Sequence, residues 1–223
     1  WGLEDVAPGL EAAWSEVEGV LILACGTSYH AGLVARYWME AVAGVPCAVE
    51  IASEFRYRAS VLRPNTAVVA ISQSGETADT MAAIEDIRAR GVGPVLAICN
   101  VRESSLARAA DVTLYTEAGP EIGVASTKAF TTQLVVLALL TVAAAKHSGR
   151  ATPAQLGQWG QELEALPGRI HRTLELDEEL RRMASGLIER HHALFLGRGP
   201  YYPVAMEGAL KLKEISYIHA EAY

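Results

Sequence analysis

The stretch from Ser72 to Thr77, Ser-Gln-Ser-Gly-Glu-Thr, constrains the fold more than any other part of the chain. Residues 66–71 before it are apolar and mostly β-branched, which is typical of a buried parallel strand. Residues 78–90 after it carry apolar side chains at helical spacing and end at Gly91, so we expect a helix. Hydroxyls and an amide at a strand-to-helix turn predict an anion site, most plausibly for a phosphate, at the positive end of the helix dipole.

Two common phosphate-binding motifs do not describe this turn. A Walker loop needs Gly-Lys-Ser/Thr, and a dinucleotide-binding loop needs three glycines, whereas this turn contains only Gly75. The alternative is a simple helix cap, because serine and threonine are favoured at helix N-termini. From these residues alone, an anion site and a cap both stay open.

Strand-like and helical segments alternate along the first two thirds of the chain. The predicted strands are residues 19–25, 47–51, 66–71, 94–99 and 112–115, and the predicted helices are 1–18, 29–43, 54–57, 76–90, 104–109 and 126–146. This spacing predicts a flavodoxin-like α/β fold with three layers around a five-stranded parallel sheet. Ligands bind such sheets at the carboxyl ends of the strands, where Gly26-Thr27-Ser28 makes a second hydroxyl-bearing turn.

The sequence pattern changes twice in the remainder of the chain, first to a charged helical segment and then to a strand-and-helix pattern like that of the start. We place the first domain at residues 1–150 and a charged helical connector, broken at Pro167-Gly168, at 151–190. Residues 191–223 resemble a repeat of the start, since Leu194–Tyr202 aligns with Leu21–Tyr29 as strand, glycine turn, aromatic and helix. We expect the first strand and helix of a truncated second domain, with Pro203 at its first helical position, leaning on residues 1–190 or on a partner chain.

Composition excludes several classes of protein. The formal charge of −7 and the lack of basic runs argue against nucleic acid and anionic membranes as partners. The longest aliphatic run, Leu134 to Ala145, is too short to span a bilayer, and the acidic start is no signal peptide. We therefore expect a cytoplasmic piece of a longer protein, with its three cysteines as buried thiols. No histidine pairs with a cysteine or carboxylate at ligand spacing, so we expect neither a metal site nor a cofactor.

Three charged residues near the end of the chain share one helical face. Glu207, Lys211 and Glu214 lie at i, i+4 and i+7. Most such stripes are solvated surface ion pairs. The functional alternative is a carboxylate base kept ionised by a neighbouring cation.

A polar loop, Glu121–Lys128, enters the long predicted helix. Ser126 or Thr127 would cap that helix in the simplest interpretation. The alternative is that the loop forms a third wall of the pocket and lends the Ser126 hydroxyl to a sugar.

Four stretches together resemble one family. Cys25–Ser28, Ser72–Thr77, Glu121–Gln133 and Glu207–Tyr223 are similar to the isomerase half of the glutamine–fructose-6-phosphate aminotransferases (glucosamine-6-phosphate synthases), which is built from two sugar-isomerase (SIS) domains. The hydroxyl-rich turn alone indicates only an SIS domain, whereas the third and fourth stretches point to the aminotransferase. The resemblance implies that fructose 6-phosphate, with ammonia from glutamine, becomes glucosamine 6-phosphate as a proton moves from C1 to C2.

The resemblance also implies roles for particular residues. The sugar would be contacted by Thr27, Val124 and Ser126. Glu214 would be the base that moves the C1 proton, with Lys211 beside it. The phosphate would be held by Ser28, Ser72, Gln73, Ser74 and Thr77.

The chain departs from the family pattern at both ends. The resemblance implies a glutaminase domain upstream and, after Tyr223, a histidine donated across a homodimer and a lysine that forms a Schiff base. We therefore expect these residues to bind sugar phosphate but to be catalytically incomplete. Two alternatives stay open: a non-catalytic SIS sugar-phosphate-binding module, and a related SIS ketose isomerase or deglycase that acts without glutamine.

Overall fold

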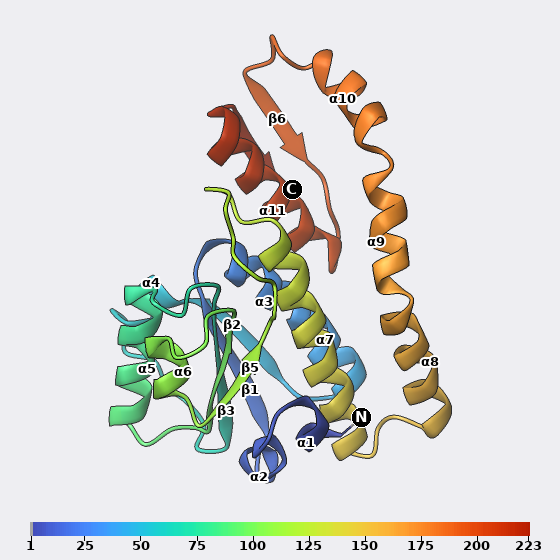
Figure 1. Ribbon diagram of the computed structural model, residues 1–223. Coiled ribbons are helices and arrows are strands. Elements are labelled where there is room, and N and C mark those ends of the chain that lie inside the picture. Colours follow the sequence, from blue (N-terminus) through green and yellow to red (C-terminus); the bar gives the residue numbers. More distant parts are fainter. Residues whose placement is uncertain (1) are drawn as a thin grey trace.

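A parallel sheet forms the centre of the molecule. The computed structural model describes residues 2–223 and arranges the sheet in the order β2-β1-β3-β4-β5 (Figure 1). All neighbouring strands are parallel, which confirms the predicted flavodoxin-like sheet. The chain order reverses between β1 and β3, so their carboxyl ends border the switch point. The strands are β1 (Gly19–Ala24), β2 (Cys47–Ile51), β3 (Thr66–Ser72), β4 (Val95–Cys99) and β5 (Val112–Tyr115).

Helices cover both faces of this sheet because successive strand residues point to opposite sides. Ile22 and Ile71 belong to one apolar cluster, whereas Leu23 and Ala70 belong to the other. The first face is covered by α1 (Leu3–Val6), α2 (Leu10–Trp14), α3 (Gly26–Trp38), the π-helical turn η1 (Met39–Ala43) and α7 (Lys128–His147). The second face is covered by α4 (Ala52–Phe55), α5 (Ala78–Ala89) and α6 (Ser105–Ala109). The predicted three-layer α/β/α architecture is therefore confirmed.

The long helix α7 belongs to this core. By length and composition alone it could cross a membrane, but 56% of its most apolar window is buried inside the protein. Leu137, Leu140 and Ala144 are fully buried against the sheet. An apolar helix packed in this way is the core helix of a globular fold.

The N-terminal helix predicted over residues 1–18 is wrong in its extent. The chain forms two short helices, α1 and α2, and Gly9 between them has φ = 79°. A left-handed residue interrupts a helix, and glycine adopts that conformation without strain. Trp1 lies outside the described residues.

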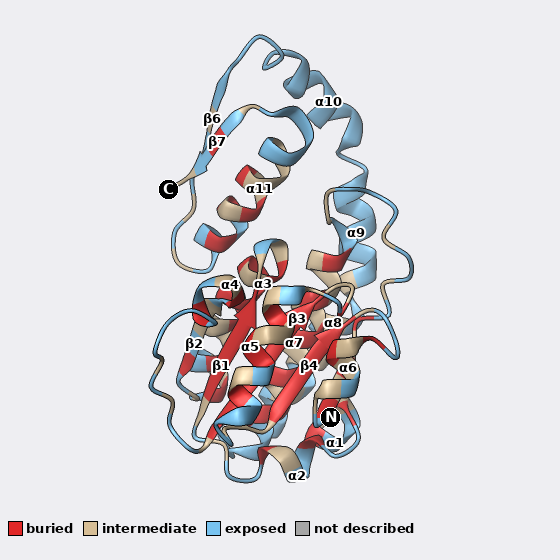
Figure 2. Cartoon of the chain, turned by 90° about the vertical axis from the view of Figure 1, so that its left-hand side faces the viewer, coloured by how far each residue is buried: buried red, intermediate tan, exposed pale blue. Residues whose placement is uncertain are grey.

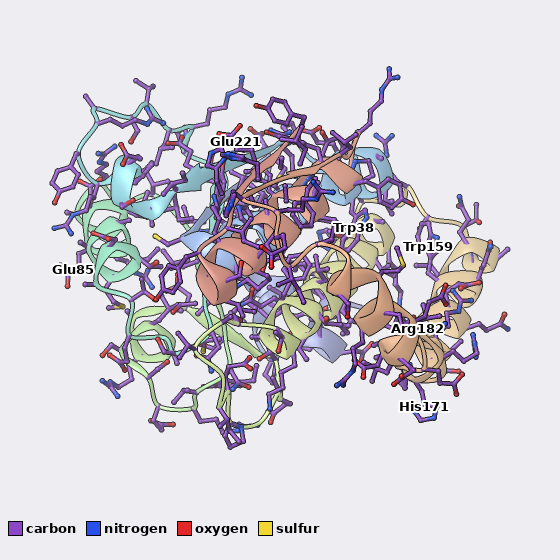
Figure 3. The ribbon with its side chains drawn as sticks, turned by 90° about the horizontal axis from the view of Figure 1, so that it is seen from above. Trp38, Glu85, Trp159, His171, Arg182 and Glu221 are labelled. Atoms are coloured by element: carbon purple, nitrogen blue, oxygen red, sulfur yellow. The ribbon has the colours of Figure 1, made fainter. Side chains whose placement is uncertain are left out.

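The connector runs along the molecule as α8 (Pro153–Glu164), α9 (Leu166–Leu174) and α10 (Asp177–Ser185). The predicted break at Pro167-Gly168 is wrong, because Pro167 lies in the first turn of α9, where its missing N–H is not needed. Viewed from above, His171 projects at the outer edge of this connector (Figure 3). Its side chains are almost all exposed beyond residue 166.

The C-terminal part contains one more strand than predicted. β6 (His192–Phe195), α11 (Tyr201–Ser216) and β7 (His219–Ala222) form a strand-helix-strand unit in which β6 and β7 pair in parallel. Pro203 lies in the first turn of α11 but not at its first position, which Tyr201 occupies. This unit is largely exposed, in contrast to the buried sheet below it (Figure 2). Its main contact with the rest of the chain is made by α11, which packs on α3.

Candidate functional site

A pocket opens at the carboxyl ends of β1 and β3, at the switch point of the sheet. Its volume is about 260 Å³. Every residue that the sequence predicts for the site lines this pocket. The lining residues are Cys25, Thr27, Ser28, Ile71, Ser72, Gln73, Ser74, Thr77, Val124, Ser126, Lys211 and Glu214.

The turn between β3 and α5 is held in shape by its own side chains. The Ser72 hydroxyl accepts a hydrogen bond from the Gly75 N–H over 3.1 Å and lies 2.8 Å from the Thr77 hydroxyl. The Ser74 hydroxyl accepts from the Glu76 N–H over 3.2 Å. Gly75 has φ = 68°, and a Cβ there would collide with Ser104, so the turn needs glycine.

The capping alternative does not describe this turn. Thr77 occupies the N-cap position of α5, yet its side chain makes no capping hydrogen bond. The N-terminal N–H groups of α5 are therefore not satisfied by that hydroxyl, and the positive end of the helix dipole faces the pocket rim. The arrangement suits an anion.

The first turn of α3 supplies the second wall. The helix begins at Gly26, earlier than the predicted Tyr29, so Thr27 and Ser28 belong to the helix itself. The Ser28 hydroxyl accepts a hydrogen bond from Gln133 Nε2 over 3.0 Å. Gln133 is 1% exposed, and its Oε1 has no hydrogen-bond partner among the described residues. Sequence reasoning gave Gln133 no role, although a polar side chain in the apolar stretch of α7 is a usable signal.

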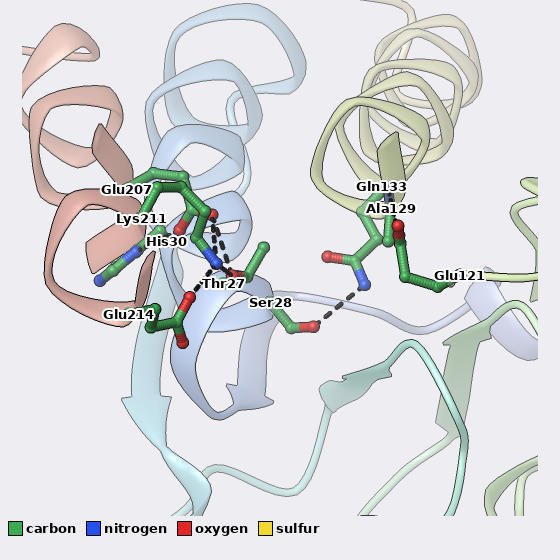
Figure 4. A network of polar contacts seen from close by, with 9 residues as sticks. All are labelled: Thr27, Ser28, His30, Glu121, Ala129, Gln133, Glu207, Lys211 and Glu214. Atoms are coloured by element: carbon green, nitrogen blue, oxygen red, sulfur yellow. Dashed lines mark hydrogen bonds and ion pairs between the residues drawn. The ribbon is translucent and has the colours of Figure 1, made fainter. Parts of the chain in front are cut away.

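The third wall is the charged face of α11 (Figure 4). Lys211 Nζ donates to Glu214 Oε2 over 2.5 Å and lies 3.5 Å from Glu207 Oε1, so the predicted shared face is confirmed. Lys211 Nζ also donates to the Thr27 hydroxyl over 3.1 Å, and that hydroxyl donates to Glu207 Oε1 over 2.9 Å. These contacts bring α11 against the start of α3.

Glu207 is not part of a solvated stripe. It is 6% exposed, and its Oε2 lies 2.8 Å from His30 Nδ1. Burial alone would raise the pKa of Glu207, but hydrogen bonds from His30 and Thr27 and the charge of Lys211 together hold this pKa below its ordinary value. The spacing of His30 and Glu207 along the sequence does not indicate this pair, because the fold joins residues that lie 177 positions apart.

The loop before α7 contributes Val124 and Ser126. Ser126 Oγ is buried and has no hydrogen-bond partner in the part of the chain that the structure describes, whereas Val124 is fully exposed. The predicted capping by Ser126 or Thr127 is wrong, because Glu121 Oε2 accepts from the Ala129 N–H over 3.3 Å instead. Within residues 2–223 the Ser126 hydroxyl is therefore not used.

Within residues 2–223 no group of three or more histidine, cysteine or acidic side chains is placed to hold a metal ion. Burial raises the pKa of the Cys47 and Cys99 thiols, and the nearby Glu40 carboxylate helps to bring that of Cys47 to about 12. A wider hollow of about 360 Å³ lies at the amino ends of β1, β2 and β3. That is the opposite end of the sheet from the one where parallel sheets bind ligands.

The sheet order and the pocket at the switch point define a doubly wound parallel α/β domain with its candidate site at the carboxyl ends of the strands. The chain belongs to the SIS domain family, whose model matches residues 15–143. It is 59% identical over 221 residues, or 99% of the chain, to a glutamine–fructose-6-phosphate aminotransferase [isomerizing] of Pseudomonas putida, of which it covers 36%. It is 58% identical over 97% of its length to the protein of the same name in Pseudomonas syringae pv. tomato, of which it covers 35%.

A solved structure supports the same relationship. The C-terminal domain of glucosamine-fructose-6-phosphate aminotransferase from Francisella tularensis superimposes with a TM-score of 0.94 at 49% identity. The match covers 96% of this chain and 60% of that one. The resemblance to the aminotransferases is thereby confirmed, and the chain spans about 36% of the length of the curated relatives that it matches.

Proposed function

We propose that this chain is the sugar-phosphate isomerase portion of a glutamine–fructose-6-phosphate aminotransferase. It would bind fructose 6-phosphate and form glucosamine 6-phosphate, an amino-sugar precursor, in the cytoplasm. The observation that carries the proposal is one pocket that joins the uncharged donors of the Ser72–Thr77 turn to the Lys211–Glu214 pair. A glutaminase domain that supplies ammonia and a second copy of the chain are the partners proposed with it.

The phosphate belongs at the turn after β3. Short hydroxyls of Ser72, Ser74 and Thr77 and the N-terminus of α5 offer neutral donors and a positive dipole end. Ser28 and Gln73 would complete this set of phosphate ligands. Hydrogen bonds from these uncharged donors would fix the position of the phosphate dianion. The sugar attached to it would then extend toward α11.

The chemistry belongs at α11. Glu214 would take the proton from C1 of the bound sugar and return it to C2, so that the carboxylate is regenerated in each turnover. The Lys211 ammonium donates a hydrogen bond to the Glu214 carboxylate and so holds it at the pocket. Thr27, Val124 and the unused Ser126 hydroxyl would hold the sugar between the two ends.

Calorimetry with the full-length protein tests the binding half of this proposal. We expect fructose 6-phosphate to bind and fructose, which lacks the phosphate, to bind much more weakly. Ser74→Ala should weaken binding of fructose 6-phosphate about tenfold or more, since hydrogen bonds to charged groups contribute about 1.5–3 kcal/mol. The control Ser185→Ala, on the exposed helix α10, should bind as the wild type does.

Equal binding of fructose and its phosphate would overturn the proposal. The catalytic incompleteness of residues 1–223 stays a prediction. An assay of these residues alone with fructose 6-phosphate and ammonium checks it, and turnover near that of the full-length protein would contradict it.

A further inference from the structure

Glu207 is the buried centre of the contact between α11 and α3. The Thr27 hydroxyl donates a hydrogen bond to Glu207 Oε1 over 2.9 Å, and His30 Nδ1 lies 2.8 Å from Glu207 Oε2. Both of these residues belong to α3. His30 itself is 8% exposed. Burying a carboxylate is strongly unfavourable unless hydrogen bonds compensate for the lost hydration. These two hydrogen bonds therefore stabilise Glu207 in its buried position.

The proton on His30 is fixed by its partner. The pKa of Glu207 lies below its ordinary value, so the carboxylate is ionised at neutral pH and can only accept hydrogen bonds. A nitrogen 2.8 Å from an ionised carboxylate oxygen must therefore carry a hydrogen. His30 thus acts as a donor through Nδ1.

Glu207 in turn holds the rest of the charged face. Lys211 lies 3.5 Å from Glu207 and shares the Thr27 hydroxyl with it, and Lys211 donates to Glu214. The phosphate turn is carried by β3 and α5, whereas Glu214 is carried by α11. The distance between the bound phosphate and the Glu214 carboxylate therefore depends on the contact between α11 and α3.

We propose that His30 is a positioning residue: through the Nδ1–Glu207 hydrogen bond it fixes α11, and with it Lys211 and Glu214, relative to the phosphate turn. This inference rests on the proposed function for its catalytic consequence. His30 does not line the pocket, so it contributes to the rate without touching the sugar. Small displacements of a base reduce the rate of proton transfer strongly, which gives the bond its effect.

Two substitutions separate the hydrogen bond from the volume of the side chain. His30→Phe retains a ring and removes the donor, whereas His30→Asn retains an N–H donor at the position of Nδ1. His30→Leu is a second removal variant in case Phe does not fit. His171→Asn, on the exposed helix α9, is the matched control.

In the full-length protein, we expect His30→Phe to lower kcat about tenfold or more, as expected for a misplaced catalytic group, and to leave KM and the Kd for fructose 6-phosphate within about threefold of wild type. His30→Asn should recover most of kcat, and His171→Asn should not change it. The inference is overturned if His30→Phe and His30→Leu keep the wild-type kcat, or if His30→Asn lowers kcat as much as His30→Phe does. A change in Kd alone would also overturn it.

A measurement without substrate keeps the test independent of the proposed function. Amide hydrogen exchange along α11 should be faster in His30→Phe and His30→Leu than in wild type, and close to wild type in His30→Asn. Unchanged exchange in the removal variants overturns the inference. A wild-type protein that neither binds nor converts fructose 6-phosphate overturns the proposed function instead, and the exchange result still decides the role of His30.

Discussion

Lys211 donates a hydrogen bond to Glu214, three residues further along α11, over 2.5 Å. The two side chains differ in exposure, since Lys211 is 18% exposed and Glu214 is 39% exposed. The cation is thus held within the protein, while the carboxylate stays accessible from the pocket. This asymmetry suits a base that must meet a bound molecule.

Glu214→Gln should separate binding from chemistry in the full-length protein. The amide cannot accept a proton, so we expect turnover of fructose 6-phosphate to fall about 10²–10⁴-fold, the usual contribution of a general base. Calorimetry should give a Kd close to wild type, because the phosphate turn is unchanged. Glu178→Gln on the exposed helix α10 is the control. A wild-type protein that binds sugar phosphate but never turns it over would instead indicate a non-catalytic binding module.

Gly32 and Gly157 should respond to alanine in opposite directions. A Cβ at Gly32 in α3 would approach Ile22 Cγ2 to 2.8 Å and Val49 Cγ1 to 3.1 Å. We expect Gly32→Ala to lower the free energy of unfolding by about 1–3 kcal/mol through overpacking. Gly157 in α8 has nothing within 4 Å, so Gly157→Ala should raise it by up to about 1 kcal/mol. Denaturant unfolding measures both, and a stabilised Gly32→Ala would refute the close packing of α3 on the sheet.

Cys25 should report occupancy of the pocket. It is half-buried and lines the pocket, whereas Cys47 and Cys99 are buried thiols with raised pKa values. Because the thiolate is the reactive form, we expect iodoacetamide at pH 8 to modify Cys25 first and the other two only after unfolding. Fructose 6-phosphate should slow the modification of Cys25 severalfold, as measured by peptide mass spectrometry. Fructose without phosphate is the control, and equal protection by both sugars would argue against a phosphate anchor.

Glu207 should make the protein sensitive to acid. Its pKa in the folded protein lies below that of an exposed glutamate, about 4.3. The stabilisation is therefore complete above about pH 4.3 and is lost as the pH falls through the folded-state pKa. The thermal midpoint of the wild-type protein should fall as the pH is lowered below about 4.3, and the midpoint of Glu207→Gln should fall less steeply. Glu178→Gln should follow wild type, and parallel curves for Glu207→Gln would contradict this account.

The sequence was sufficient for the sheet and for the pocket residues. The strands β1, β3 and β4 are continuous apolar runs, which only a sheet covered on both faces accommodates. Ser72–Thr77 is a local motif, so its place at the end of β3 follows from the neighbouring residues. The shared face of Lys211 and Glu214 likewise follows from helical spacing.

The burial of Glu207 could not be predicted in the same way. It depends on a contact with His30, and no local pattern encodes which helix faces which. The strand β7 was missed because His-Ala-Glu-Ala has little intrinsic strand preference and forms only by pairing with β6. The break at Pro167 was wrong because a single proline fits both the end of one helix and the first turn of the next.

The pocket draws its walls from widely separated stretches of the chain. The turn after β3 is complete within a few consecutive residues, whereas Lys211 and Glu214 lie on α11, after the whole connector. In the proposed function, the residues that hold the phosphate and the residues that move the proton therefore belong to separate parts of the chain. A descendant that exchanged its C-terminal element would inherit the anchor intact and could acquire a different reaction on the same captured molecule.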